Sequence, residues 1–271
     1  MGKLNRWIAK HYWLSIVLFF LLPFIALLAI AQVCNDWVTL WCCAVGYVWI
    51  FWGARWLPAR GNALMKRPLE ILVNECDPYP YLEEAKKQRD FQGNRNMKFT
   101  YIYNEISALK EVGELEQADQ LLMSVSEGSV AQMAPLIQAM YFSERVYHSI
   151  RLKNADGMEF WYKKLVDVNN RMKRKPHKQF TASLMISVRV HYHRARKEYA
   201  QSLQHLQLIP QRNLRERVVV AWNCASIHLA EGEREAAKDK LEFVVQNGNK
   251  LYIVAEAKKL LESINMEETI Q

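Results

Sequence analysis

The 271-residue chain carries a formal net charge of +8, and about half of its residues are hydrophobic. Its five cysteines include no Cys-x-x-Cys pair, so neither a zinc site nor a redox pair is indicated. Cys34, Cys42 and Cys43 lie in an apolar N-terminal region, whereas Cys76 and Cys224 are isolated, which is typical of a reducing compartment.

Two hydrophobic runs, Trp13–Val33 and Trp37–Leu57, are joined by the polar turn Cys34-Asn35-Asp36. Each run has 21 residues. A helix of that length spans about 31 Å, close to the roughly 30 Å hydrocarbon core of a bilayer. The first run has no charged residue and contains Pro23, which membrane helices tolerate and which can kink them. Residues 13–57 therefore predict a transmembrane helical hairpin.

Positive charges flank this hairpin on one side only. Lys3, Arg6 and Lys10 precede the first run. The cations Arg55, Arg60, Lys66 and Arg67 follow the uncharged part of the second run, and the only charged residue of the connecting turn is Asp36. The positive-inside rule then places both chain termini in the cytoplasm and makes residues 1–12 a basic cytosolic N-terminus.

Three alternatives compete with a two-span anchor. Ala29-Ile30-Ala31 resembles a signal-peptide cleavage site, but the apolar run exceeds the usual core and a second run follows at once. A lipoprotein signal ending at Cys34 lacks small residues before the cysteine. A buried soluble hairpin requires a large apolar partner.

Residues 58–96 predict a connector with one or two helices. Pro58, Gly61 and Pro68 are expected to interrupt it, and Asp77-Pro78 is a helix-start signal. From Met97 onward, apolar residues keep helical spacing and no strand pattern occurs.

Residues 97–264 predict four antiparallel helix pairs and a final helix, followed by an acidic, frayed tail at 265–271. The expected segments are 99–112 with 115–125, Leu136–Leu152 with Gly157–Val168, Phe180–Ala195 with Tyr199–Leu208, Val218–Ala230 with Glu233–Val245, and Lys250–Ile264.

Two segments carry a repeat signature, Gly113-Glu114-Leu115-Glu116-Gln117-Ala118 and the octapeptide Ala230–Ala237, which contains Gly232 and Ala237. Both resemble the turn and second helix of tetratricopeptide repeats (TPRs). In the two middle units, Lys153 and Lys197 replace the turn glycine, while Met158 and Ser202 replace the small alanine. The resemblance covers about residues 97–245, with repeat spacings longer than the family's 34 residues.

This resemblance implies an all-α protein, in which the membrane hairpin precedes a TPR-like α-solenoid of about four helix pairs with a C-terminal capping helix. The chain is similar to membrane-anchored repeat proteins of Gram-positive bacteria, and this similarity implies a location in the bacterial cytoplasmic membrane. Such arrays hold protein or peptide partners on a concave surface. The expected function is a membrane scaffold or adaptor, and the alternative is a regulatory sensor.

The third pair is strongly basic. Residues 171–217 contain twelve Lys/Arg against two Glu, whereas residues 61–170 and 218–271 each carry a net charge of −3. Four interpretations stay open: a solvated helix face with a basic loop at 171–178, docking on anionic lipid, an acidic protein partner, and nucleic acid, which is least favoured because no recognition motif occurs. The candidate binding residues are Arg171, Lys173, Arg174, Lys175, Lys178, Arg194, Arg196, Lys197, Arg212, Arg215 and Arg217.

No catalytic, cofactor or metal constellation is predicted. His191 and His193 sit two residues apart, so on a helix they point about 200° apart and do not converge on one ion. Glutamates near helix N-termini complement the helix dipole. Aromatic residues of the second pair favour core packing, with a ligand-facing groove as the alternative: Tyr141, Phe142, Tyr147, Phe160, Trp161 and Tyr162.

Overall fold

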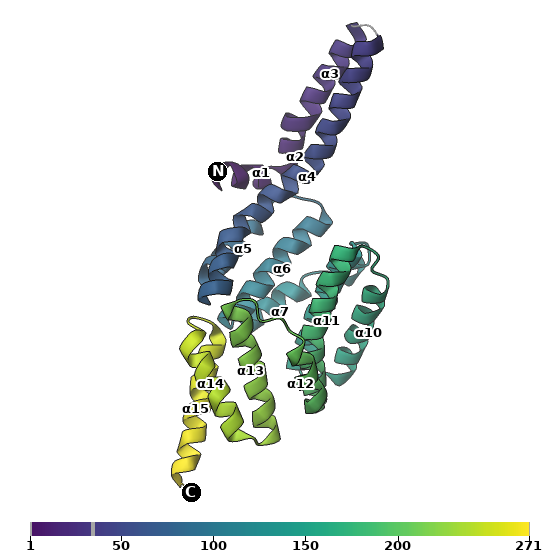
Figure 1. The fold of residues 1–271 in the computed structure, drawn as a ribbon. Helices are drawn as coiled ribbons and strands as arrows, with labels where there is room; N and C mark the ends of the chain where they lie inside the picture. The colour runs from purple at the N-terminus through teal and green to yellow at the C-terminus, as the bar shows by residue number, and fades with distance from the viewer. Residues whose placement is uncertain (1, 34–35, 271) are drawn as a thin grey trace.

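The computed structural model describes residues 2–33 and 36–270, apart from the side chains of residues 2, 31, 33, 36, 39–40, 42, 50, 52–62 and 267–270. Within these limits the chain is all-helical and contains no strand, as the sequence predicts. A helical hairpin projects from a body of packed helices (Figure 1). The predicted turn at Cys34 and Asn35 lies outside the described residues.

The hairpin pairs a broken helix with a continuous one. Helix α2 (Tyr12–Ile16), the π-helix η1 (Val17–Leu21) and α3 (Leu22–Val33) run beside the first part of α4 (Asp36–Glu75). The irregularity has a local cause, because Pro23 has no N–H to donate to the carbonyl of Phe19 four residues earlier. The Trp49 indole N–H on α4 donates to that carbonyl at 2.8 Å. A side chain of the facing helix thus satisfies the acceptor that the proline leaves free.

Gly46 lets the two arms of the hairpin approach closely. A Cβ atom at this position would lie 2.6 Å from the Phe24 ring, so only glycine fits without a shift of the ring. The residues next to Gly46 on α4, Val45 and Tyr47, are exposed. Gly46 is therefore a packing position between α3 and α4.

The prediction that Pro58, Gly61 and Pro68 interrupt the chain after the hairpin is wrong. Helix α4 continues through Pro58, Gly61 and Pro68 to Glu75, so its 40 residues run for about 60 Å. Packing explains why the local breakers do not end it: α1 (Gly2–Lys10) and α5 (Tyr79–Gln88) both pack along α4. Tertiary contacts override helix propensity here.

Both terminal segments are helical where the structure describes them. The basic N-terminal segment, for which no secondary structure was predicted, forms the helix α1 and the beginning of α2. Likewise α15 (Tyr252–Ile270) continues through the acidic segment that was predicted to fray. The helix prediction for Lys250–Ile264 was correct in kind and too short.

The four predicted helix pairs are present, with boundaries shifted by a few residues. Helix α8 (Glu127–Val130), between the first and second pairs, was not predicted. The pairs are α6 (Arg95–Val112) with α7 (Leu115–Met123), α9 (Pro135–Arg151) with α10 (Ala155–Asn170), α11 (Lys175–Ala195) with α12 (Tyr199–Gln207), and α13 (Leu214–Glu231) with α14 (Arg234–Asn247).

All four pairs share one turn geometry. A residue one or two positions after the first helix has a positive φ, which is 87° at Gly113 and 83° at Gly232, and 54° and 61° at Lys153 and Lys197. The next N–H donates to a carbonyl five residues back, as from Glu114 to Leu109 at 2.9 Å; the same bond forms in the other three turns. This is the Schellman arrangement, which favours glycine at the left-handed position. The lysines adopt the glycine conformation at a cost.

The small-residue positions of the repeat signature are packing positions. Ala118, Met158, Ser202 and Ala237 are all buried, and none is more than 6% exposed. Most of the core forms one continuous cluster that runs from Met65 on α4 to Ile264 on α15. Burial of this apolar surface drives the stacking of the pairs.

The two ends of the helical body meet. The backbone N–H of Lys250 donates to the carbonyl of Cys76 at 3.2 Å, and Lys250 Nζ pairs with Asp77 at 2.6 Å. Helix α13 packs on α4, and α15 packs on α6. The helical body therefore curves back on itself. The first helix of each pair, namely α6, α9, α11 and α13, lines a central cavity.

Candidate functional site

The central cavity has a volume of about 580 Å³ and is lined by the first helix of every pair. The segment before α13 and the start of α15 complete its wall. This volume is in the range of small-molecule sites. Aromatic and charged side chains share the lining, including Tyr103, Tyr147, Trp222 and Tyr252.

Four of the five lysine and arginine side chains in this lining are paired with carboxylates. Lys110 Nζ lies 2.9 Å from Glu144 and 4.4 Å from the centre of the Tyr147 ring. Arg215 pairs with Glu111 across α13 and α6. The other two pairs are Arg151 with Asp119, and Arg212 with Glu216.

Arg194 is different, because its recorded partners are neutral. Its guanidinium donates to Asn223 Oδ1 at 3.3 Å and lies 3.1 Å from His191 Nδ1, and it pairs with no carboxylate among the described residues. Burial lowers the pKa of Arg194, and the nearby Tyr252 partly offsets this. A half-buried guanidinium without an anion favours binding of an oxyanion, which it can hold by charge-assisted hydrogen bonds.

His191 stays neutral beside this guanidinium. Burial lowers its pKa to about 3, with further contributions from the positive charges of Arg194 and Lys110. Its ring meets Tyr147 edge to face at a centroid distance of 5.1 Å. His191 therefore lines the cavity as a neutral side chain that can form hydrogen bonds, and the positive charge at this place belongs to Arg194.

The eleven predicted cations do not form one surface. Arg194, Arg212 and Arg215 line the cavity. Arg196 points outward and pairs with Glu198 at 2.8 Å. Lys197 is the left-handed residue of its turn. The other six are exposed: Arg171, Lys173, Arg174, Lys175, Lys178 and Arg217.

Five of these exposed cations gather where α10 leads into α11. Figure 1 places this connection at the end of the helical body that faces the hairpin. The predicted basic loop at 171–178 is shorter than expected, because α11 begins at Lys175. The side chains of Lys173, Arg174, Lys175 and Lys178 form no ion pair with the described residues. We call residues 171–178 the basic connection.

Several cavity residues were missing from the sequence prediction, notably Lys110, Glu111, Glu144, Arg151 and Tyr252. Three of the first helices carry side chains with polar groups at i, i+3 or i+4, and i+7, a spacing that places them on one face of each helix. That stripe was the available signal. Its members are Tyr103, Ser107 and Lys110 on α6, Glu144, Tyr147 and Arg151 on α9, and Ser187, His191 and Arg194 on α11.

The aromatic residues of the second pair are divided between the core, the cavity lining and the exposed surface. Tyr141 and Trp161 are buried and meet edge to face at 6.1 Å, as core packing requires. Tyr147 lines the cavity, whereas Phe160 is 50% exposed.

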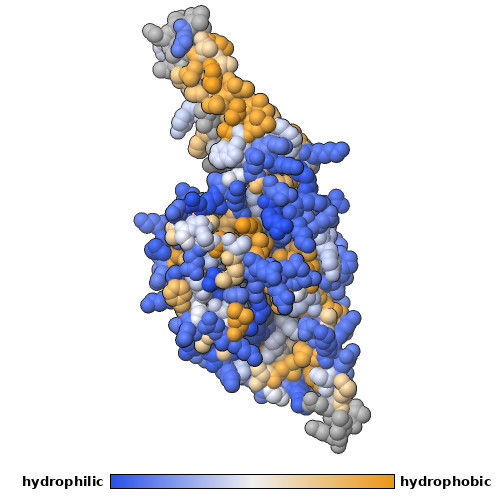
Figure 2. Space-filling model, turned by 180° about the vertical axis from the view of Figure 1, so that it is seen from behind, coloured by the Kyte–Doolittle hydropathy of each residue, from blue (hydrophilic) through white to orange (hydrophobic). Residues whose placement is uncertain are grey.

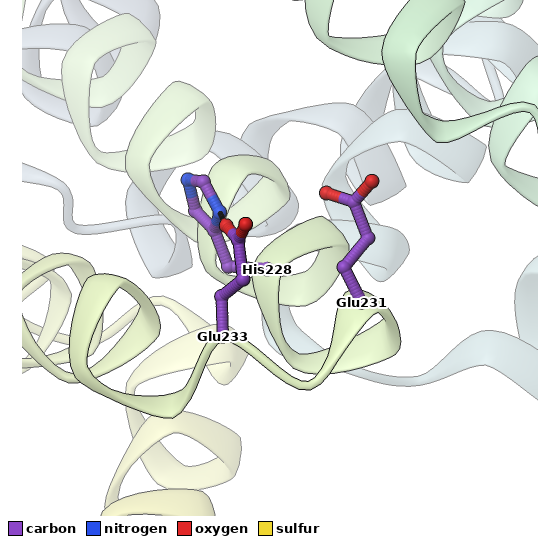
Figure 3. A group of neighbouring side chains, drawn as sticks. All are labelled: His228, Glu231 and Glu233. Carbon is purple, nitrogen blue, oxygen red and sulfur yellow. Dashed lines mark hydrogen bonds and ion pairs between the residues drawn. The ribbon is translucent and has the colours of Figure 1, made fainter.

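One group of side chains has metal-ligand chemistry. Ligand atoms of His228, Glu231 and Glu233 lie within 4.8 Å of one another, and Figure 3 shows the His228 ring against the Glu233 carboxylate. His228 Nδ1 is 2.6 Å from Glu233, and the third pair repeats this contact between His193 and Glu198 at 2.7 Å. The repetition identifies the contact as a feature of the turn, and both glutamates of the group are exposed.

Within the described residues, one segment is long and apolar enough to cross a membrane, Tyr12–Ile30, and 6% of it is buried. Signal sequences and buried core helices can pass the same test, but a core helix would be mostly buried. A second span at Trp37–Leu57 is not supported by this criterion. Part of it, including Trp52, Arg55 and Trp56, lies outside the described side chains. Figure 2 shows a largely hydrophobic hairpin above a hydrophilic body.

Comparison of the chain with protein-family models, curated proteins and solved structures finds no match.

Proposed function

We propose that this protein is a membrane-anchored scaffold that holds an acidic segment of a partner protein in its central cavity. The hairpin, including the second predicted span, anchors the chain, and the helical body lies on the cytoplasmic side. The TPR-like arrangement of the helix pairs provides the binding surface. The protein acts by bringing its partner to the membrane and performs no catalysis.

The observation that carries this proposal is the lack of a carboxylate partner for Arg194 among the described residues. Every other cation of the cavity lining has a carboxylate partner, whereas Arg194 has hydrogen-bond partners that carry no charge. An aspartate or glutamate of a partner would supply the missing anion. Hydrogen bonds to charged groups contribute about 1.5–3 kcal/mol, so one such contact changes affinity by about tenfold or more.

A defined peptide tests the proposal. A fluorescently labelled hexaglutamate peptide is titrated against the full chain in neutral nanodiscs, and binding is measured by fluorescence anisotropy, with hexaglutamine as the uncharged peptide. We expect salt-sensitive binding of hexaglutamate that weakens by about tenfold or more in Arg194→Met. Arg196→Met is the matched control, because Arg196 lies nearby and points outward. Equal binding by the Arg194→Met variant and the original chain would refute the site.

The basic connection supports a second candidate function, a sensor that reads lipid charge. Its exposed cations lie at the hairpin-facing end of the body. Each basic side chain near an anionic leaflet contributes about 1 kcal/mol. Binding of this surface to anionic headgroups would hold the body against the membrane.

Hydrogen exchange of the full chain in nanodiscs tests this second function. Residues 171–178 are expected to exchange more slowly in anionic phosphatidylglycerol nanodiscs than in phosphatidylcholine, and high salt should remove the difference. Replacement of Lys173, Arg174 and Lys175 by alanine should also remove it. Identical exchange in both lipids would exclude lipid docking by the basic connection.

A further inference from the structure

Helix α1 has two different faces. One face is buried, with Ile8 0% exposed and Ala9 3% exposed. An adjoining face is exposed and still apolar, because Leu4 is 54% exposed and Trp7 is 39% exposed. Two exposed large apolar side chains, three residues apart on one helix face, form a stripe rather than a scattered pair.

This stripe is held in a fixed position. Arg6 pairs with Glu84 of α5 at 2.7 Å, and the N–H of Gln92 donates to the carbonyl of Ala9 at 3.2 Å. Ile8 and Tyr12 form a small apolar cluster against which Met97 of α6 packs. The buried face thus fastens α1 to the helical body, and the fastening determines the direction in which Leu4 and Trp7 point.

The surroundings of the stripe indicate what covers it. Helix α1 lies across the base of the hairpin (Figure 1), and the chain enters the apolar segment Tyr12–Ile30 directly after it. Trp13 at the start of that segment is 55% exposed. The exposed stripe of α1 therefore lies directly before the exposed apolar surface of the hairpin in the chain.

The charges on α1 fit the same environment. Lys3 and Lys10 are exposed near the two ends of the helix, on either side of Leu4 and Trp7. Tryptophan prefers the membrane–water interface, where its ring is half in an apolar environment, and lysines reach the headgroups. A helix with an apolar face, flanking lysines and a tryptophan matches the composition of helices that lie in the interface plane.

We propose that α1 is an interfacial helix, whose Leu4 and Trp7 insert into the headgroup region of the bilayer beside the hairpin. Through its contacts with α5 and α6, α1 then fixes the helical body at a set height and tilt on the membrane. This inference rests on the membrane anchoring proposed above. It goes further, because it assigns a lipid-binding surface to a segment outside both hydrophobic runs.

A fluorophore at three single positions tests this inference. Each of Leu4, Leu18 and Leu152 is replaced by cysteine, labelled with an NBD probe, and studied in the full chain in nanodiscs. Cys34, Cys42 and Cys43 are replaced by alanine. Cys76 and Cys224 are retained, since Cys76 is buried and burial raises the pKa of both thiols, that of Cys76 to about 11.

The three positions differ in their expected contact with lipid. Leu18 lies within the apolar segment and is 42% exposed, and Leu152 is a control leucine on the body that is 62% exposed. We expect blue-shifted emission and several-fold slower quenching by dithionite at positions 4 and 18 than at position 152. An interfacial helix lies about 5–10 Å below the headgroup surface, deep enough for this protection.

Two other outcomes separate the two proposals. A protected probe at position 18 with a freely quenched probe at position 4 would overturn the interfacial helix and leave the anchoring intact. Free quenching at position 18 would overturn the anchoring, and the inference about α1 with it. Each labelled variant is first checked for an unchanged melting temperature, and the exposed location of all three leucines favours this.

Discussion

The cations of residues 171–217 are close in sequence and differ in environment. The cations of the basic connection are exposed and form no ion pair with a carboxylate among the described residues, whereas Arg194 and Arg215 line the cavity. Arg215 even lies between the two ends of the body, because its partner Glu111 belongs to the first pair. Charge counted along the chain therefore combines cations that support the fold with cations that are available to bind. The predictions below test whether the two groups are separable.

The largest expected effect concerns Arg215. Its replacement by alanine should lower the free energy of unfolding by about 3 kcal/mol, because it leaves Glu111 partly buried without its partner. Urea unfolding of the full chain in detergent, followed by circular dichroism, measures the change. Arg217→Ala, two residues away and exposed, is the control and should stay within about 0.5 kcal/mol.

A double variant distinguishes the ion pair from simple packing. Because apolar replacement of a buried pair is often neutral, Arg215→Met with Glu111→Leu should recover most of the lost stability. If the double variant is as unstable as Arg215→Ala, the closure of the helical body does not depend on charge pairing.

His191 gives the next effect, through pH. Its pKa is lowered to about 3 in the folded protein, against about 6.5 when unfolded, so the unfolded chain binds more protons in between. Stability should therefore fall as the pH decreases below 6.5, by at most about 1.4 kcal/mol per pH unit from this group. His191→Gln should flatten this dependence in urea titrations between pH 5 and 7. An unchanged slope would place His191 in a hydrated environment.

A smaller effect on stability is expected at Lys197, which is one of the eleven candidate cations and lies in the turn of the third pair. Lys197→Gly should stabilise the fold by about 0.5–1 kcal/mol, because φ is +61° at this position and glycine adopts it without strain. Lys153→Gly should behave alike, since its φ is +54°. A loss of stability in both variants would show that the lysine side chains make contacts worth more than the backbone strain.

The smallest effect on stability belongs to the basic connection. Replacing Lys173, Arg174 and Lys175 by alanine should change the free energy of unfolding by less than about 0.5 kcal/mol in total, because all three positions are exposed. A larger loss would mean that these cations support the fold, and would remove the contrast with Arg215.

The sequence predicted the helices well because their apolar periodicity is a local signal. It also identified the turn at Gly113 and the weaker turns at Lys153 and Lys197, whose geometry is the same. It failed at α4, where packing by α1 and α5 outweighs two prolines and a glycine. Local propensity contains no information on such contacts.

The candidate site was only partly predictable. Arg194 and Arg215 stand out as charges, but their different roles depend on Asn223 and Glu111, which come from other helix pairs. Closure of the body creates the cavity, and closure depends on contacts such as that of Lys250 with Asp77, 173 residues apart. No periodic pattern in a single helix reports these distant contacts.

The most direct test compares two variants in two assays on one preparation of the full chain in nanodiscs. Arg194→Met should lose hexaglutamate binding by about tenfold or more and retain lipid-dependent protection of residues 171–178. The alanine variant of Lys173, Arg174 and Lys175 should lose that protection and keep most of its hexaglutamate affinity. If both variants lose both properties to the same extent, the third helix pair carries a single binding surface, and the division into a cavity site and a membrane-facing connection is wrong.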